Sequence, residues 1–273
     1  AGGGHPQRPS LRVNPAPVEQ VHALIGLMSG TSLDGVDGVL GLIDHQGQWH
    51  GSLAHAHEPF DAPLKAELLA LNTPGPDELH RAALAGQAVS RVYARVVERL
   101  RPHLPAHTPL LALGAHGQTV RHRPELGYTL QLLAPALLAE LTGVDVVADL
   151  RSRDVAAGGH GAPLVPVFHQ VVMGRNDQAV AVLNVGGMAN VSLLRPGHPP
   201  LGFDCGPGNV FMDAWCQQHL EQPYDADGAW AASGQVQARW LALALQEPYF
   251  HRAPPKSTGR DLFHADWLQD KLS

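Results

Sequence analysis

Cysteine, aromatic residues and long apolar runs are all scarce in this chain. Only Cys205 and Cys216 occur among 273 residues, and neither belongs to a C-x-x-C pair. This excludes a disulfide framework and favours a reducing, cytoplasmic compartment. No apolar run approaches the roughly 20 residues of a membrane-spanning helix, and residues 1–20 lack the apolar middle of a signal peptide. We therefore expect no membrane association.

Basic residues are too few and too scattered for a nucleic-acid surface. The chain has 19 Lys and Arg against 25 Asp and Glu, a net charge of −6, and no basic stripe. Its 17 histidines show no repeated ligand spacing, so no histidine metal centre is predicted. A hydrophobic fraction of 44% and a mean hydropathy of −0.09 indicate a globular chain. The length suffices for two domains, preceded by a Gly- and Pro-rich flexible tail over residues 1–21.

The first informative stretch is an apolar run from Ile25 that stops at a turn and resumes as a second apolar run to Leu40. This pattern predicts strand, tight turn and strand, with Gly30 and Gly35 supplying backbone freedom. Small residues leave backbone N–H groups of such a turn open to a phosphate, and Ser29, Thr31 and Ser32 add hydroxyls. Asp34 and Asp37 suit a hydrated Mg²⁺ beside that phosphate. An ordinary hairpin with polar turn formers is the alternative.

A similar pattern recurs in the second half of the chain. Residues 179–194 again read as apolar strand, glycine-containing turn and apolar strand, with Asn184 before the turn and Asn190 after it. Two hairpins of one design indicate duplicated lobes that face a shared phosphate chain. We therefore expect a first lobe over residues 22–150 and a second over residues 151–273.

Polar residues also follow two short strands in the first lobe. His116 and Gln118 come after the strand expected at Leu110–Leu113, where open α/β sheets place ligands, so both are candidates for sugar contacts. A loop histidine without a role is the alternative. The strand over residues 144–148 is followed by Arg151 and Asp154, which we interpret as a binding loop between lobes rather than as surface ion pairs. A helix is expected to open at Pro163.

Other polar residues are candidates for metal-binding, catalytic or phosphate-binding sites. His55, His57 and Glu58 lie in a strand expected over residues 49–60, and the spacing of two between the histidines favours one strand face over a metal site. Asp204 is expected to end a short strand before a Gly- and Pro-rich turn, where its carboxylate suits a general base. Capping of that turn is the alternative. The Lys256–Gly259 stretch lacks the upstream glycines of a Walker A loop, so we reject that interpretation.

Five segments together closely resemble the anhydro-N-acetylmuramic acid kinase family, in the order of that family. They are Gly30-Thr-Ser-Leu-Asp-Gly-Val-Asp37, Gly114-Ala-His-Gly-Gln-Thr119, Asp149-Leu-Arg-Ser-Arg-Asp-Val-Ala-Ala-Gly-Gly-His-Gly-Ala-Pro-Leu164, Asn184-Val-Gly-Gly187 and Phe203-Asp-Cys-Gly-Pro-Gly-Asn209. The likeness runs from about His22 to the last residue. It implies an α/β protein with the two-lobed, actin-like ATPase (ribonuclease H-like) fold.

The resemblance also implies an activity. The family uses ATP and water to open the 1,6-anhydro bridge of anhydro-N-acetylmuramic acid and to phosphorylate O6. The product is N-acetylmuramic acid 6-phosphate, an intermediate of peptidoglycan recycling and amino sugar metabolism. ATP and Mg²⁺ are the implied cofactors, the anhydro sugar is the implied partner, and the oligomeric state is left open, a homodimer included.

Site residues follow from the matching motifs. The first phosphate loop would comprise Gly30, Thr31, Ser32, Leu33, Asp34, Gly35, Val36 and Asp37. The second would use Asn184, Gly186 and Gly187. Asp204 would be the base that deprotonates the attacking water, and Asp34 would hold Mg²⁺ through the phosphates. His116, Gln118, Arg151 and Asp154 match segments on the sugar side.

Two departures from the family's pattern stand out. Leu150 occupies a position where we expect an aromatic residue. Family members continue through a further Gly-rich adenosine-binding segment, so we expect the second lobe to be incomplete at residue 273. A truncated, non-catalytic sugar-binding fragment is therefore one alternative. A nucleotide-independent glycoside hydrolase that pairs Asp149 with Asp204 is another.

Overall fold

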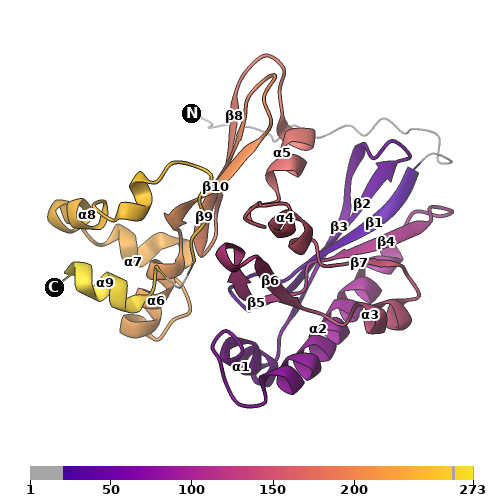
Figure 1. The fold of residues 1–273 in the computed structure, drawn as a ribbon, viewed down its shortest axis with the longest axis horizontal. Helices are drawn as coiled ribbons and strands as arrows, with labels where there is room; N and C mark the ends of the chain where they lie inside the picture. The colour runs from indigo at the N-terminus through magenta and orange to yellow at the C-terminus, as the bar shows by residue number, and fades with distance from the viewer. Residues whose placement is uncertain (1–20, 260–261, 273) are drawn as a thin grey trace, which may run out of the picture. The chain divides into compact units, whose positions relative to one another are not determined.

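The computed structural model describes residues 21–259 and 262–272. The described chain forms two compact units, each considered by itself (Figure 1). The first contains the residues up to Arg121 together with Leu130–Leu150, and the second contains His122–Thr129 together with the residues from Arg151 onward. The lobe boundary expected after residue 150 stays a prediction. The expected tail lies outside the described residues, except that Val21 already begins the first strand.

The first unit is built on a five-stranded sheet of order β3-β2-β1-β4-β7. Its strands are β1 (Val21–Met28), β2 (Gly35–Asp44), β3 (Trp49–Pro59), β4 (Leu110–Ala115) and β7 (Val146–Val147). Strand β2 pairs antiparallel with both β1 and β3, whereas β4 pairs parallel with β1 and β7 pairs parallel with β4. An antiparallel meander extended by parallel strands is the arrangement of ribonuclease H-like folds, and it confirms the predicted fold class.

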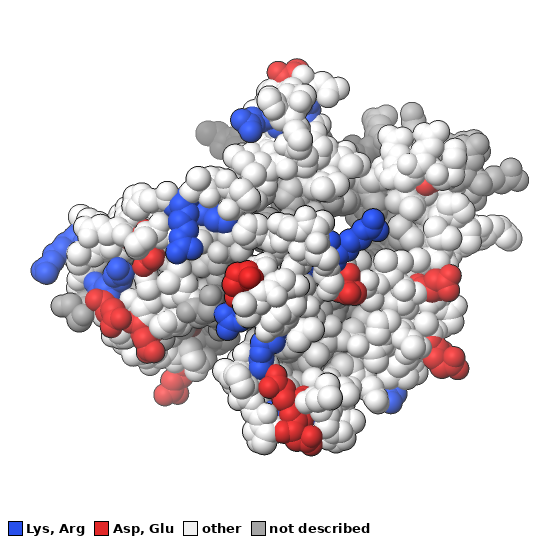
Figure 2. All heavy atoms as spheres, in the orientation of Figure 1, with Lys and Arg blue, Asp and Glu red and all other residues white. Residues whose placement is uncertain are grey.

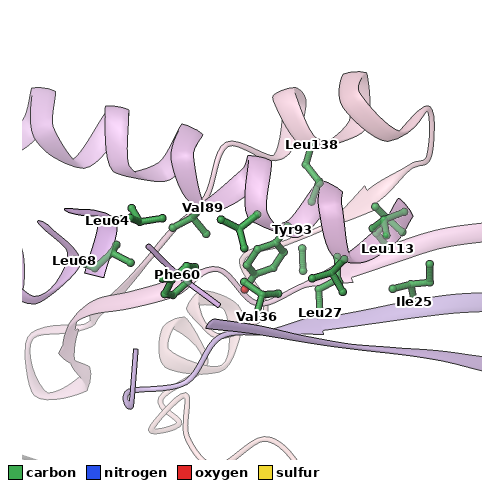
Figure 3. Packing of buried hydrophobic residues seen from close by; sticks show 14 of the residues in the cluster. Ile25, Leu27, Val36, Phe60, Leu64, Leu68, Val89, Tyr93, Leu113 and Leu138 are labelled. Carbon is green, nitrogen blue, oxygen red and sulfur yellow. The ribbon is translucent and has the colours of Figure 1, made fainter. Parts of the chain in front are cut away.

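Three helices accompany this sheet: α1 (Ala62–Ala70), α2 (Glu78–Leu100) and α3 (Pro135–Thr142). Apolar residues recur on one face of α2, and Val89, Tyr93 and Val96 are fully buried there. They pack with Ile25 and Leu113 of the sheet, and Figure 3 shows this layer between α2 and the strands. Such burial is the main favourable contribution to folding. The core therefore fixes β1 and β4, whose ends carry two of the predicted motifs.

The start of α2 is exposed and lacks a side-chain cap. Asp77 stands at the N-cap but has φ 50°, and its side chain makes no capping hydrogen bond. Leu79, in the first turn, has 87% of its surface exposed. The packed face of α2 begins only at Ala85. The first turn is held instead by the Arg81 N–H, which donates to the Asp77 carbonyl, and by Glu78, whose Oε1 accepts from Arg121 Nη2 at 2.6 Å.

The second unit contains a three-stranded antiparallel sheet of order β10-β9-β8. Its strands are β8 (Val180–Val185), β9 (Met188–Leu194) and β10 (Leu201–Pro207). A separate two-stranded sheet consists of β5 (Gln118–Arg123) and β6 (Tyr128–Leu132), of which only His122–Thr129 belongs to the second unit. The helices of this unit are α4 (Ser152–Ala156), α5 (Pro166–Met173), α6 (Val210–Leu220), α7 (Ala229–Ala232), α8 (Ala238–Ala244) and α9 (Ala265–Leu272). Short 3-10 turns are η2 (Arg101–His103), η3 (Pro124–Leu126), η4 (Ala226–Gly228) and η5 (Pro248–His251).

Helix α5 packs on the second sheet. His169 Nδ1 lies 2.9 Å from Ser192 Oγ of β9. Pro163 and Pro166 both lie against Gly202 of β10. The expectation that Pro163 opens this helix is wrong, because Pro166 occupies the first helical position. Pro163 instead packs in the loop before α5.

Two further features concern the helices and the surface. Ser233 follows the end of α7 and donates its hydroxyl to the Trp230 carbonyl, and α8 starts only at Ala238. None of the described helices is long and apolar enough to cross a membrane. Acidic and basic side chains are interspersed on the face drawn in Figure 2.

Candidate active site

The turn between β1 and β2 leaves polar side chains and consecutive backbone N–H groups exposed. Leu33 adopts φ 56° and is buried, which anchors the turn, while Thr31, Ser32 and Asp34 are exposed. Ser32 Oγ donates to Asp34 Oδ1 at 2.9 Å. Within residues 21–259 and 262–272, no backbone or side-chain acceptor binds the N–H groups of Thr31 and Ser32. Exposed consecutive N–H groups of this kind form phosphate-binding concavities.

The second strand of this hairpin begins at a position that only glycine fits. A Cβ at Gly35 would lie 2.3 Å from the Glu58 carbonyl oxygen of β3. Two residues further on, Asp37 Oδ1 lies 3.0 Å from His55 Nε2 and 3.2 Å from His57 Nδ1. The expectation that His55 and His57 share a strand face is confirmed. Their pairing with Asp37 was not foreseen, because the register of β2 and β3 cannot be read from either strand alone.

Buried polar residues hold this turn from behind. Ser29 is 1% exposed, and its hydroxyl donates to the Gly117 carbonyl at 2.9 Å and lies 3.0 Å from the Tyr93 hydroxyl. Its predicted place among phosphate-binding hydroxyls is therefore wrong, since the core uses it. Gln118 is also buried, and its Nε2 donates to the Gly30 carbonyl at 3.1 Å. His116 is buried beside them, with Nδ1 2.7 Å from the Gly117 carbonyl oxygen.

The second hairpin is joined to the start of α6. Gly208 N–H donates to the Gly187 carbonyl at 2.8 Å, and Asn209 N–H donates to the Gly186 carbonyl at 2.7 Å. A Cβ at Gly208 would lie 2.2 Å from that Gly186 oxygen, so the contact requires glycine. Asn184 is exposed at the end of β8 and faces Asn190 across the ladder. The two glycine-containing motifs 184–187 and 203–209 thus form one local structure.

The charged loop before α5 closes on itself. Asp154 Oδ2 accepts the Gly161 N–H at 2.7 Å, and Arg151 Nη1 donates to the Gly161 carbonyl at 2.5 Å. Gly159 approaches the Asp154 carboxylate so closely that a Cβ there would lie 2.3 Å from Oδ2. Burial lowers the pKa of Arg151, while the Asp204 charge acts to raise it. The structure therefore brings Arg151 and Asp204 into one electrostatic neighbourhood.

Asp204 lies within β10 rather than at its end. The strand runs on to Pro207, with an irregular register between Asp204 and Gly206. Its Oδ2 accepts the Thr258 N–H at 3.0 Å. Burial raises the pKa of this carboxyl, against the lowering influence of the Thr258 N–H and the Arg151 charge. A partly buried carboxylate of raised pKa suits a proton acceptor.

The residues present fit a nucleotide better than a metal held by protein alone. The described residues contain no group of three or more His, Cys, Asp or Glu side chains placed to hold a metal ion. Mg²⁺ usually keeps several waters and binds through one or two carboxylates plus phosphates. The exposed Asp34 and the open amides of Thr31 and Ser32 match that requirement.

Sequence reasoning missed three residues around Asp204. Tyr249 donates its hydroxyl to the Asp204 carbonyl at 2.8 Å, and the Lys256 carbonyl accepts the Asp204 N–H at 3.0 Å. Thr258 supplies the N–H that binds Oδ2. The Lys256–Gly259 stretch did stand out in the sequence, but only as a failed phosphate loop. No local pattern could link it to a strand some fifty positions earlier.

Residues 22–273 match the family described as anhydro-N-acetylmuramic acid kinase. A protein of that name from Albidiferax ferrireducens is 58% identical, with 91% of this chain and 70% of the relative covered. Those from Bordetella petrii and Bordetella pertussis are each 62% identical over 91% of this chain, with 66% and 65% of the relative covered.

The chain thus spans about two thirds of the length of these relatives. Among solved structures, the ethanolamine utilization protein EutJ from Carboxydothermus hydrogenoformans gives a TM-score of 0.38 at 11% identity, with 96% of this chain and 84% of that chain covered. A likeness this distant adds nothing to the assignment, which the family match and the close relatives carry. The chain belongs to the anhydro-N-acetylmuramic acid kinase family.

Proposed function

We propose that the protein containing this chain uses ATP and water to convert anhydro-N-acetylmuramic acid into N-acetylmuramic acid 6-phosphate and ADP. Family membership supports the reaction. One structural observation supports its chemistry: the Asp204 carboxylate is partly buried, with Oδ2 bound by the Thr258 N–H. Such a carboxylate can take a proton from water in a neutral solution and still release it afterwards.

The proposed division of labour follows from the groups present. Asp204 takes a proton from the water that attacks C1 of the sugar. As the C1–O6 bond breaks, O6 gains the negative charge that makes it a phosphoryl acceptor. Arg151 and Asp154 hold the loop at Gly161 in shape on the sugar side, and His116 and Gln118 are proposed to serve the same substrate.

The two hairpins are proposed to bind the nucleotide. Thr31 and Ser32 offer open N–H groups, and Gly186 and Gly187 form the corresponding turn of the second unit. Asp34 is proposed to contact Mg²⁺ through its water shell. When bound, ATP would supply the phosphoryl group, and Mg²⁺ would offset the negative charge of its phosphates. A cytoplasmic location, a role in peptidoglycan recycling and a homodimeric state stay proposals, the first supported by two free cysteines.

Product analysis tests this proposal. The anhydro sugar is incubated with the full-length protein, Mg²⁺ and ATP, and the products are resolved by mass spectrometry. We expect one sugar phosphate per ADP, and neither product with Asp204→Asn. A ring-opened sugar that forms without ATP would instead identify a glycoside hydrolase. Normal turnover by Asp204→Asn would remove Asp204 from the proposed role.

A further inference from the structure

The segment Lys256–Thr258 lies along the free edge of β10. Because the sheet order is β10-β9-β8, β10 has a neighbouring strand on one side only. On that side Asp204 pairs with Asn190. On the other side the Asp204 N–H donates to the Lys256 carbonyl, and the Thr258 N–H returns to Asp204 Oδ2, both at 3.0 Å. The segment therefore hydrogen-bonds to both the backbone and the carboxylate of Asp204. We call Lys256–Thr258 with these contacts the clasp.

A second set of contacts fixes the clasp itself. Lys256 Nζ donates to the carbonyls of Tyr249 and Phe250 at 3.1 Å each and lies 4.8 Å from the Tyr249 ring centroid. Tyr249 is 1% exposed, and its hydroxyl donates to the Asp204 carbonyl at 2.8 Å. The contacts form a closed circuit from Asp204 to Lys256, from Lys256 to Tyr249, and back to Asp204. The Lys256 ammonium group thus binds backbone carbonyls rather than the Asp204 carboxylate.

The clasp treats the two carboxylate oxygens differently. Oδ2 accepts the Thr258 N–H, whereas Oδ1 accepts no hydrogen bond from the residues the structure describes. Thr258 Oγ1 is buried and lacks a hydrogen-bond partner within the same described set. A buried hydroxyl without a partner is costly, which is typical of a group that gains one in a complex. Both observations place unused hydrogen-bonding capacity beside Asp204.

We propose that Lys256–Thr258 is a positioning segment for the Asp204 carboxylate in the phosphorylating reaction. The Thr258 N–H fixes Oδ2, so Oδ1 is the atom that takes the proton from water. Thr258 acts through Asp204, as a positioning residue. This inference rests on the proposed function, since it assigns a partner to the proposed base.

The test uses the pH dependence of kcat/KM. Asp204 must be ionised to accept a proton, so activity falls as the pH drops through its pKa. Among charged side chains, Arg151 acts to lower the pKa of Asp204, while the Asp204 charge acts to raise the pKa of Cys205 and Tyr249, and Lys256 acts to lower that of Cys205. The Thr258 N–H favours the ionised form. Its loss in Thr258→Pro should therefore move the acidic limb of the profile to higher pH by about one unit and lower kcat about tenfold.

Three matched variants complete the experiment. Thr258→Val keeps the N–H and the side-chain shape, so the acidic limb should stay in place. Lys256→Met releases the clasp without removing the N–H, so the limb should move upward by less. Gln235→Ala, at an exposed position of the second unit outside this segment, should behave as the unaltered protein. If Thr258→Pro does not fold, Lys256→Met decides the question.

An acidic limb that stays in place in both Thr258→Pro and Lys256→Met would overturn the inference. A merely structural role would lower activity in these variants without moving the limb. Failure of the proposed function looks different, because the unaltered protein would then form no sugar phosphate at all.

Discussion

The Gln118 side-chain amide donates to the Gly30 carbonyl at 3.1 Å and joins two motifs that lie 88 positions apart in the sequence. Gln118 stands at the start of β5, and Gly30 opens the turn after β1. The hydrogen bond therefore fixes the turn that we propose to bind the nucleotide phosphates.

Substitution of Gln118 by leucine tests this contact. Gln118→Leu removes the donor and leaves the Gly30 carbonyl without it, so the turn should lose one fixed point. We expect the KM for ATP to rise about tenfold, equivalent to about 1.4 kcal/mol, while the exposed Gln87→Leu leaves it unchanged. The KM for the sugar is measured in parallel. An unchanged KM for ATP would contradict the positioning role, whatever the KM for the sugar, which Gln118 is also proposed to serve.

The Tyr93 hydroxyl provides a prediction about stability. Tyr93→Phe removes the hydroxyl that lies 3.0 Å from Ser29 Oγ, and we expect the free energy of unfolding to fall by about 1 kcal/mol. Burial also raises the pKa of Tyr93 from 10.0 to about 12. Because the folded state holds this proton more tightly, stability should decline as pH rises between these values.

Denaturant unfolding measured from neutral to alkaline pH checks both expectations. The Tyr93→Phe variant should lose part of the alkaline decline. The exposed Tyr224→Phe should lose none of it. If stability declined equally with pH in all three proteins, the pKa of Tyr93 would be the same in the folded and unfolded states, and the prediction would be wrong.

Gly208 provides a test of the junction between the second hairpin and α6. In Gly208→Ala the new Cβ would meet the Gly186 carbonyl oxygen at 2.2 Å, so the turn at Gly186 and Gly187 must move. We expect a loss of about 1–3 kcal/mol in the free energy of unfolding, together with a higher KM for ATP. Gly26→Ala is the matched control, because its Cβ would meet nothing within 4 Å. A Gly208→Ala variant as stable as this control would refute the contact.

Asp204 should cost stability at neutral pH. Burial raises its pKa above the ordinary value of 3.8, so folding favours the protonated carboxyl. The stability that this preference contributes is present below pH 3.8 and is lost as the pH rises through the folded-state pKa. Asp204→Asn should therefore melt at a higher temperature than the unaltered protein at pH 7, with the difference closing under acidic conditions. A lower melting temperature at pH 7 would mean that the ionised carboxylate stabilises the fold.

The sequence predicts the local elements well and the long-range contacts poorly. The strands on either side of the Gly30–Gly35 and Gly186–Gly187 turns follow from apolar runs broken by small residues, and the structure confirms them. The fold class came from the family resemblance. The prediction that Pro163 opens a helix was wrong because a proline starts a helix only where the following residues continue it. In this segment the helix starts at Pro166.

The environment of Asp204 was not predictable from its own surroundings in the chain. A single carboxylate before Gly and Pro reads equally well as a turn former or as a base. The distinction depends on Thr258 and Tyr249, which approach from a segment that carries no recognisable pattern of its own. Only the folded structure places these residues together.

The most direct test of the central claim is ADP release by the full-length protein with Mg·ATP, with and without anhydro-N-acetylmuramic acid. We predict ADP release that depends on the sugar, falls by orders of magnitude in Asp204→Asn and stays largely intact in the exposed control Gln235→Ala. ADP release at the same rate with and without the sugar, or none with both substrates present, would contradict the claim that this family member phosphorylates the anhydro sugar.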